Sequence, residues 1–275
     1  MRPDSAALRE TMLHRIRIVM IHTTHPGNIG SAARAMKTMG LSRLFLVRPE
    51  HFPHADSTAL ASGAADLLDT AVVVDDLNEA LQGVGWVVGT SARLRHIPWP
   101  RFDARQVAEQ MMHECAAHDL DIAILFGRED RGLTNEELQL CHVHLEIPTN
   151  PDYSVLNVAA AMQVVCYEIR MAWLATLSPA QPAVVQMPLT HVEWDEPPVS
   201  QELMQQFYKH MEQAFRAVGF LDVEHPGPML VRIQRLFQRV RLDRLEYNLL
   251  RGFFKDVLKM NNQRSDHQPS RQRES

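Results

Sequence analysis

Four short polar segments contain the residue types that could do chemistry. They are HPGNIGSAAR (25–34), TSAR (90–93), FGREDRGL (126–133) and NPDYSVLN (150–157), and they hold most of the clustered glycine, asparagine, serine, threonine and arginine. Each lies at or near the end of a short apolar run of the kind that forms a buried strand. Ligands bind at the carboxyl ends of strands in parallel sheets, so we expect the four segments to share one site.

The segment 25–34 begins as a polar turn and opens a helix predicted at Ser31–Met39, and its backbone amides could face an anion. Its spacing matches neither the G-x-G-x-x-G fingerprint nor a G-K-[ST] phosphate loop, which argues against dinucleotide and nucleoside-triphosphate sites. Arg34 falls one helical turn beyond Gly30, on a face otherwise made of small residues and methionine. It is either a site residue or an ordinary surface arginine, and its spacing alone favours the second.

The segment 126–133 places charged residues and two glycines directly after a buried strand. Gly127 would let the backbone approach a ligand closely, and Gly132 would allow a turn with positive φ. A plain polar turn is the alternative. The segment TSAR carries less information by itself.

The stretch from Ile147 to Ala172 combines a stiff loop with an apolar helix. Pro148 and Pro151 prevent regular structure across the turn, and Asp152 or Ser154 is expected to cap the helix that follows. Residues 155–165 leave almost no polar face, so we expect this helix to be buried in a core or between subunits. An ordinary strand–loop–helix crossover would have the same pattern.

Two other kinds of site have little support. His22 and His25, and His142 and His144, are closely spaced, but no acidic or cysteine partner completes a ligand set near either pair, so we expect no metal. No Ser–His–Asp or Cys–His arrangement has a local signature here, although such triads are assembled in space.

Composition describes a globular protein of a reducing compartment. Of the 275 residues, 45% are hydrophobic and 22% charged, which is enough for an ample core. The three cysteines have no CxxC spacing, so a disulfide framework is not expected. No apolar run approaches the ~18 residues of a membrane span, and the first residues are charged. We therefore expect a cytoplasmic protein without a membrane anchor.

Short apolar strands alternate with helices up to about residue 175. This alternation predicts an α/β fold with a mostly parallel sheet and helices on both faces. We expect a flexible leader at 1–14, the sheet domain at 15–175, a proline-rich linker at 176–200, a helical region at 201–260 and a disordered tail at 261–275. The three expected C-terminal helices span 201–218, 229–240 and 244–260.

The charge of the chain is uneven. The net charge is −5, yet residues 226–275 contain 11 Lys/Arg against 5 Asp/Glu. Such a basic segment fits either a nucleic-acid contact or a solvated helix face, and both remain open. The candidate contacts are Arg232, Arg235, Arg239, Arg241 and Lys255.

Taken together, the motifs resemble those of one family. HPGNIGSAARAMKTMGL, GTSAR, LFGREDRGLTNEEL and NPDYSVLNVAAAMQVVCYEIRMAW are similar, in order and spacing, to the signatures of the SPOUT methyltransferase superfamily. Within it the chain resembles the bacterial TrmJ-type tRNA ribose 2′-O-methyltransferases. The match covers about residues 15–175, and the helical C-terminal region has a counterpart with a looser signature.

The resemblance implies a deep trefoil knot in the C-terminal part of the sheet domain, which is a rare exception to unknotted topology. It also implies S-adenosylmethionine as cofactor, tRNA as partner, and a homodimer with the active site at the subunit interface. By position, Arg34 matches the catalytic arginine, with Asn28 in the same motif and Ser154 and Asn157 in the last. The implied cofactor contacts are Thr90, Ser91, Ala92, Gly127, Ile147, Ser154, Val155 and Leu156. His22 departs from the acidic or other polar residue that relatives often carry.

The implied reaction is methylation of the ribose 2′-hydroxyl of cytidine or uridine at nucleotide 32 of the tRNA anticodon loop. One alternative is the same chemistry on another tRNA or rRNA nucleotide. Another is an RNA-binding module that keeps the fold without catalysis. A dinucleotide-dependent oxidoreductase is disfavoured because the fingerprint glycines are missing.

Overall fold

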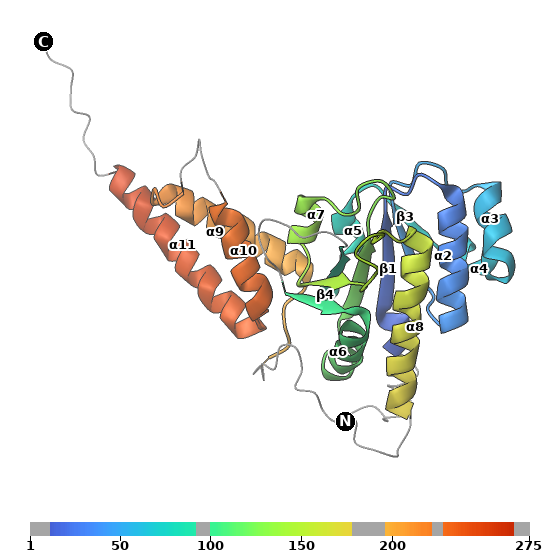
Figure 1. Cartoon of the computed structure of the whole chain (residues 1–275). Coiled ribbons are helices and arrows are strands. Elements are labelled where there is room, and N and C mark those ends of the chain that lie inside the picture. The colour runs from blue at the N-terminus through green and yellow to red at the C-terminus, as the bar shows by residue number, and fades with distance from the viewer. Residues whose placement is uncertain (1–11, 92–99, 178–195, 222–227, 267–275) are drawn as a thin grey trace, which may run out of the picture. The chain divides into compact units, whose positions relative to one another are not determined.

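The computed structural model describes residues 12–91, 100–177, 196–221 and 228–266. The chain divides into two compact units, residues 1–192 and 193–275 (Figure 1). Ala92 lies outside the described residues, as do most of the expected leader and linker and the end of the expected tail.

A seven-stranded sheet forms the centre of the first unit. Its order is β3-β2-β1-β6-β4-β7-β5, and every pair within it is parallel. The strands are β1 (Ile16–Ile21), β2 (Arg43–Val47), β3 (Val72–Val74), β4 (Val84–Thr90), β5 (Arg101–Asp103), β6 (Asp121–Phe126) and β7 (Val143–Glu146). The predicted parallel sheet is confirmed. The short edge strand β5 was not expected, because three mostly polar residues give no periodic signal.

The central strands are buried on both faces, which explains their continuous apolar sequences. Along β1, Ile18 and Met20 belong to one hydrophobic cluster, while Val19 and Ile21 belong to the other. Helices α2 (Pro26–Met39), α6 (Ala104–Ala117) and α8 (Val158–Leu177) pack on the first side (Figure 1). The short helices α5 (Leu77–Ala80) and α7 (Asn135–Gln139) contribute to the second. The loops that leave these strands are thereby held by a rigid core.

Helix α2 begins earlier than expected. It starts at Pro26 instead of Ser31, with Pro in the first turn, where its missing N–H is no loss. HPGNIGS is therefore the first turns of a helix and not a turn before one. Beside α2 lie α3 (Ala55–Ala61) and α4 (Ala65–Asp69), which are joined by a 3₁₀ turn at Ser62–Ala64.

The start of helix α8 corrects the expected cap. The Asn157 side-chain oxygen accepts hydrogen bonds from the backbone N–H of Ala159 at 2.9 Å and of Ala160 at 3.3 Å. Asn157 therefore caps α8, in place of Asp152 or Ser154. Residues 155 and 156 belong to the preceding loop.

Burial of α8 in the single chain is one-sided, so of the two expected settings the structure excludes complete burial in a core, and burial between subunits stays a prediction. Met162, Val165, Cys166 and Ile169 face the core, whereas Tyr167 and Met171 are 47% and 44% exposed. By length and composition α8 is apolar enough to cross a membrane, but this is weak evidence because its inner face packs into the sheet unit. The outer face of α8 is thus both apolar and exposed among the described residues.

The second unit is a small helical cluster. It comprises α9 (Gln201–Ala217), α10 (Met229–Val240) and α11 (Arg244–Asp266), packed around Phe207. The three expected helices are confirmed, although α11 continues past Met260 to Asp266. Arg241, expected to contact RNA, is instead only 5% exposed and ends α10 with a φ of 54°. It therefore lies in the unit and not on its surface.

Candidate active site

The carboxyl ends of β4, β6 and β7 surround a cavity of about 140 Å³. Three of the four polar segments contribute to its walls: the end of β4, the loop after β6, and the loop between β7 and α8. The lining residues include Thr90, Ser91, Phe126, Gly127, Arg128, Glu129, Leu145, Ile147, Thr149, Ser154, Val155, Leu156, Val158 and Ala161. The walls thus combine apolar side chains with hydroxyl groups, which is typical of a small-molecule site.

Glu129 connects the cavity with the start of α2. One carboxylate oxygen accepts hydrogen bonds from the Thr24 N–H and hydroxyl, each at 3.2 Å. The other accepts from the Asn28 side-chain N–H at 2.9 Å and from the His25 N–H at 3.4 Å. Asn157 then donates its side-chain N–H to the Asn28 oxygen at 3.0 Å. One chain of contacts therefore links three of the polar segments.

These donors keep Glu129 ionised. Partial burial acts to raise its pKa, but the hydrogen bonds from Asn28, Thr24 and His25 outweigh burial and hold the pKa below its ordinary value. A carboxylate can only accept hydrogen bonds, so its charge fixes the orientation of the Asn28 amide, N–H toward Glu129 and oxygen toward Asn157.

The loop after β6 is tightly folded on itself. The Gly132 N–H donates to the Arg128 carbonyl at 2.9 Å, and Gly132 has a φ of 70°, as expected. A Cβ on Gly127 would lie 2.2 Å from the Leu133 nitrogen. Gly127 is thus required by the loop's own backbone, and its expected close approach to a ligand stays a prediction.

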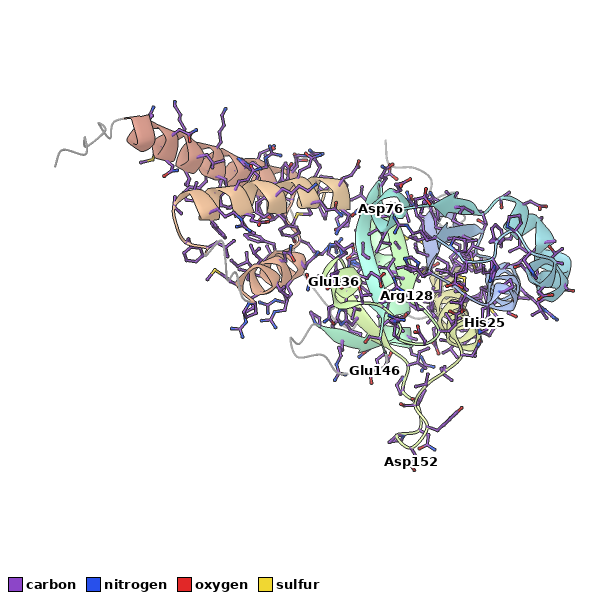
Figure 2. All side chains as sticks on the ribbon, turned by 90° about the horizontal axis from the view of Figure 1, so that it is seen from above. His25, Asp76, Arg128, Glu136, Glu146 and Asp152 are labelled. Atoms are coloured by element: carbon purple, nitrogen blue, oxygen red, sulfur yellow. The ribbon has the colours of Figure 1, made fainter. Side chains whose placement is uncertain are left out.

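The loop between β7 and α8 is held by local hydrogen bonds. The Thr149 hydroxyl donates to the Ser154 carbonyl at 3.0 Å, and the Tyr153 N–H donates to the Asn150 carbonyl at 3.0 Å. Figure 2 shows Asp152 at the tip of this loop, projecting from the body of the unit. Val155 in the cavity wall is 59% exposed, so this side of the cavity is open.

Comparison with known proteins identifies the family. The model of the SpoU rRNA methylase family matches residues 15–167, and that of the tRNA methyltransferase TrmJ C-terminal domain matches residues 202–268. A Pseudomonas aeruginosa protein, described as tRNA (cytidine/uridine/adenosine-2′-O-)-methyltransferase TrmJ, is 48% identical, covering 90% of this chain and 96% of its own. The chain belongs to the SpoU methylase family, in its TrmJ branch.

Other TrmJ proteins and solved structures agree. An Escherichia coli K12 protein, described as tRNA (cytidine/uridine-2′-O-)-methyltransferase TrmJ, is 47% identical, covering 91% of this chain and 98% of its own. The structure of TrmJ from Z. mobilis ZM4 matches with a TM-score of 0.70 and 27% identity, covering 88% of this chain and 98% of its own. A probable methylase from Haemophilus influenzae Rd KW20 matches with a TM-score of 0.57 and 42% identity, covering 92% and 99%.

The structure brings together most of the site residues expected for a TrmJ-type enzyme. Seven expected cofactor contacts line the cavity: Thr90, Ser91, Gly127, Ile147, Ser154, Val155 and Leu156. The eighth, Ala92, lies outside the described residues. Asn28 and Asn157 meet in the Glu129 network, next to that cavity.

Arg34 lies apart from this group. Its side chain is exposed on α2 and does not line the cavity formed by the described residues of its own chain. Among the described residues, a single chain therefore does not bring the expected catalytic arginine to the cavity.

Sequence reasoning missed Glu129 and Thr24 as site residues. Glu129 stands out as a charged residue in the polar loop after β6, but nothing local indicated that it would face the start of α2. That pairing spans more than one hundred positions and depends on β1 and β6 being neighbours in the sheet.

The two histidine pairs, considered above as metal ligands, lie in surroundings formed by the protein itself. His142 accepts a hydrogen bond from the Val87 N–H at 3.0 Å through Nδ1. In the described ranges, no three His, Cys, Asp or Glu side chains gather as a metal site would require. His22 follows β1 with a φ of 49°, and its pKa is lowered by burial and by the nearby charge of Arg128. It is therefore neutral at physiological pH.

Proposed function

We propose that this chain methylates a ribose 2′-hydroxyl of tRNA, at nucleotide 32 of the anticodon loop. The observation that carries the proposal is the cavity whose walls are the TrmJ motif loops, with the Asn28–Glu129–Asn157 network beside it. The curated relatives support it, since they are described as tRNA 2′-O-methyltransferases and match nearly the whole chain.

The residues of the cavity fit S-adenosylmethionine. Leu145, Ile147, Val155 and Leu156 offer an apolar surface for the adenine ring, and the hydroxyls of Thr90, Ser91, Thr149 and Ser154 offer polar partners for ribose and amino-acid groups. When bound, this cofactor supplies an activated methyl group. The protein then needs to align the acceptor hydroxyl and assist the loss of its proton.

Arg34 is the proposed partner of the reacting hydroxyl. An arginine side chain stays protonated up to a pH of about 12 or more, so it is a poor general base. Its role is to orient the 2′-hydroxyl and stabilise the negative charge that develops on oxygen, with an RNA phosphate completing the arrangement. Because Arg34 does not line its own chain's cavity, we propose that it serves the cavity of a second subunit.

A homodimer would provide that second subunit. The exposed face of α8 carries Val164, Tyr167, Met171 and Leu174, which are 38–47% exposed and follow a three-and-four spacing. This spacing is the apolar pattern by which two helices pack together. The trefoil knot and the cytoplasmic location, both implied by the family resemblance, remain predictions.

We propose that the second unit binds tRNA. Arg232, Arg239 and Lys255 are exposed, while Arg235 is half-buried and Arg241 is buried. We assign to the exposed three the contacts with phosphate oxygens, because such contacts supply much of the affinity of RNA-binding surfaces.

The deciding experiment is methyl transfer from isotope-labelled S-adenosylmethionine to a tRNA transcript, followed by mapping of the modified nucleotide. We expect label in the ribose of nucleotide 32 with the full chain and a strong loss with Arg34→Ala. Label elsewhere in tRNA would correct the position, and binding of tRNA without any incorporation would contradict the enzymatic proposal.

A further inference from the structure

Glu137 holds together two segments next to the cavity. Its two carboxylate oxygens each accept a hydrogen bond from Nη1 of Arg128, both at 3.0 Å. One of them also accepts the backbone N–H of Thr134 at 2.7 Å. The Arg128 and Glu137 side chains are only 18% and 14% exposed, so water competes weakly for these contacts.

The contacts exceed what the helix itself requires. Thr134 caps α7 by accepting the Glu137 N–H at 3.3 Å, and the Glu137 side chain returns to the Thr134 N–H. This capping box satisfies the first turn of a five-residue helix. The ion pair with Arg128 reaches beyond α7 to the loop after β6.

Arg128 is part of the cavity wall. Its carbonyl accepts the Gly132 N–H, and residues from Gly127 to Leu133 all line the cavity. The close packing of Gly127 against Leu133 joins the two ends of this loop. A change in the position of Arg128 is therefore passed to the surface that would meet the cofactor.

We infer that Glu137 is a positioning residue that sets the affinity for S-adenosylmethionine by holding Arg128 and its loop in the cavity wall. The inference rests on the proposed function, because it takes this cavity to be the cofactor site. Glu137 itself does not line the cavity and acts through Arg128. It contributes before the chemical step, so it affects binding and not the rate at saturation.

The test compares Glu137→Gln and Glu137→Ala with the wild type, all as full-length protein. Calorimetry gives the Kd of S-adenosylmethionine, and methyl transfer to tRNA gives KM and kcat. We expect Kd and KM for the cofactor to rise on the order of tenfold, as for the loss of a charged hydrogen bond, with kcat near the wild-type value. Glu136→Gln is the matched control, because Glu136 is exposed in the same turn and does not line the cavity.

A double-mutant cycle shows whether the effect passes through Arg128. Once Arg128→Met has removed the ion pair, Glu137→Ala should add little to the loss of cofactor affinity. Additive losses, an unchanged cofactor Kd, or an equal fall in kcat would overturn the inference. Should Glu137→Ala fail to fold, Glu137→Gln carries the test, with folding checked by circular dichroism.

The wild-type measurement separates this inference from the proposed function. A wild-type chain that binds S-adenosylmethionine, with variants that bind it equally well, would overturn the role of Glu137 alone. A wild-type chain that does not bind the cofactor would remove the proposed function and this inference together.

Discussion

At the scale of single residues, the site depends on the hydrogen bonds that the Glu129 carboxylate accepts. Glu129 accepts four hydrogen bonds from Thr24, His25 and Asn28, and it thereby sets the amide orientation of Asn28. Asn157 has two contacts at once, since it caps α8 and donates to Asn28. Asn28, Glu129 and Asn157 thus connect three segments of the chain beside the cavity.

The charge of Glu129 makes the free energy of unfolding depend on pH. Its folded pKa lies below its ordinary value of 4.5, so its contribution is present above that pH and is lost as pH falls through the folded pKa. We expect Glu129→Gln to be less stable than wild type by about 1 kcal/mol at neutral pH, a figure reduced for partial exposure. Urea unfolding at several pH values checks this. A difference that grew on acidification would contradict it.

Arg34 tests whether geometry or charge matters at the acceptor hydroxyl. A lysine keeps the positive charge but loses the planar, two-pronged donor of arginine. We expect Arg34→Lys to lower kcat on the order of 10²–10³, as for loss of a donor at a developing oxyanion, with little change in cofactor Kd. Nearly full activity in single-turnover methylation would count against a bidentate role.

At the scale of elements, α8 has two apolar faces, of which one packs into the core and the other is exposed in the single chain. Cys166 and Ile169 pack into the core of the sheet unit, while Val164, Tyr167 and Met171 are exposed in the single chain. Helix α2, which carries both Asn28 and Arg34, packs beside α8 (Figure 1). The proposed subunit contacts along α8 would therefore lie beside the helix that carries Arg34, the proposed catalytic residue.

A charge placed on the outer face of α8 should separate the subunits. We expect Met171→Glu to shift sedimentation from dimer to monomer and to abolish methylation, because a buried unpaired carboxylate is costly at an apolar interface. Val73→Glu provides a control, since Val73 is also an exposed apolar residue, 51% exposed on the edge strand β3. Full activity of a monomeric Met171→Glu variant would rule out an active site shared between subunits.

At the scale of the whole molecule, charge is divided between two units. The net charge of −5 conceals an excess of basic residues after residue 225, and those that the structure describes as exposed lie on α10 and α11. This division agrees with the proposal that the first unit holds the cofactor and that the second makes the main electrostatic contact with tRNA. Each unit has its own hydrophobic cluster.

The salt dependence of tRNA binding tests whether the second unit contacts the phosphates of tRNA. A variant with Arg232→Gln, Arg239→Gln and Lys255→Gln should bind tRNA more weakly, and the slope of log K against log salt should fall by about 0.7–0.9 for each phosphate that is no longer neutralised. Lys209→Gln on α9, exposed in the same unit, is the matched control. An unchanged slope in the triple variant would remove the phosphate-binding assignment.

Local sequence predicted most of the elements and the place of the site. Short apolar runs such as IRIVMI and DIAILF, six residues each, predict buried strands, and both form such strands. The polar segments that follow β4, β6 and β7 converge on one cavity because parallel strands share one carboxyl edge. The start of α8 was predicted wrongly, since Asp152, Ser154 and Asn157 are all acceptable caps by composition.

The sequence by itself therefore determined the class of fold, the helical C-terminal unit and the motif loops, because each depends on periodicity or on residues close together in the chain. Only the tertiary structure decided that Glu129 meets Asn28, that α8 leaves one face exposed, and that Arg241 is buried. Those facts depend on which strands become neighbours and on which side of a helix finds a partner. Contacts between residues far apart in the chain leave no local pattern from which they can be predicted.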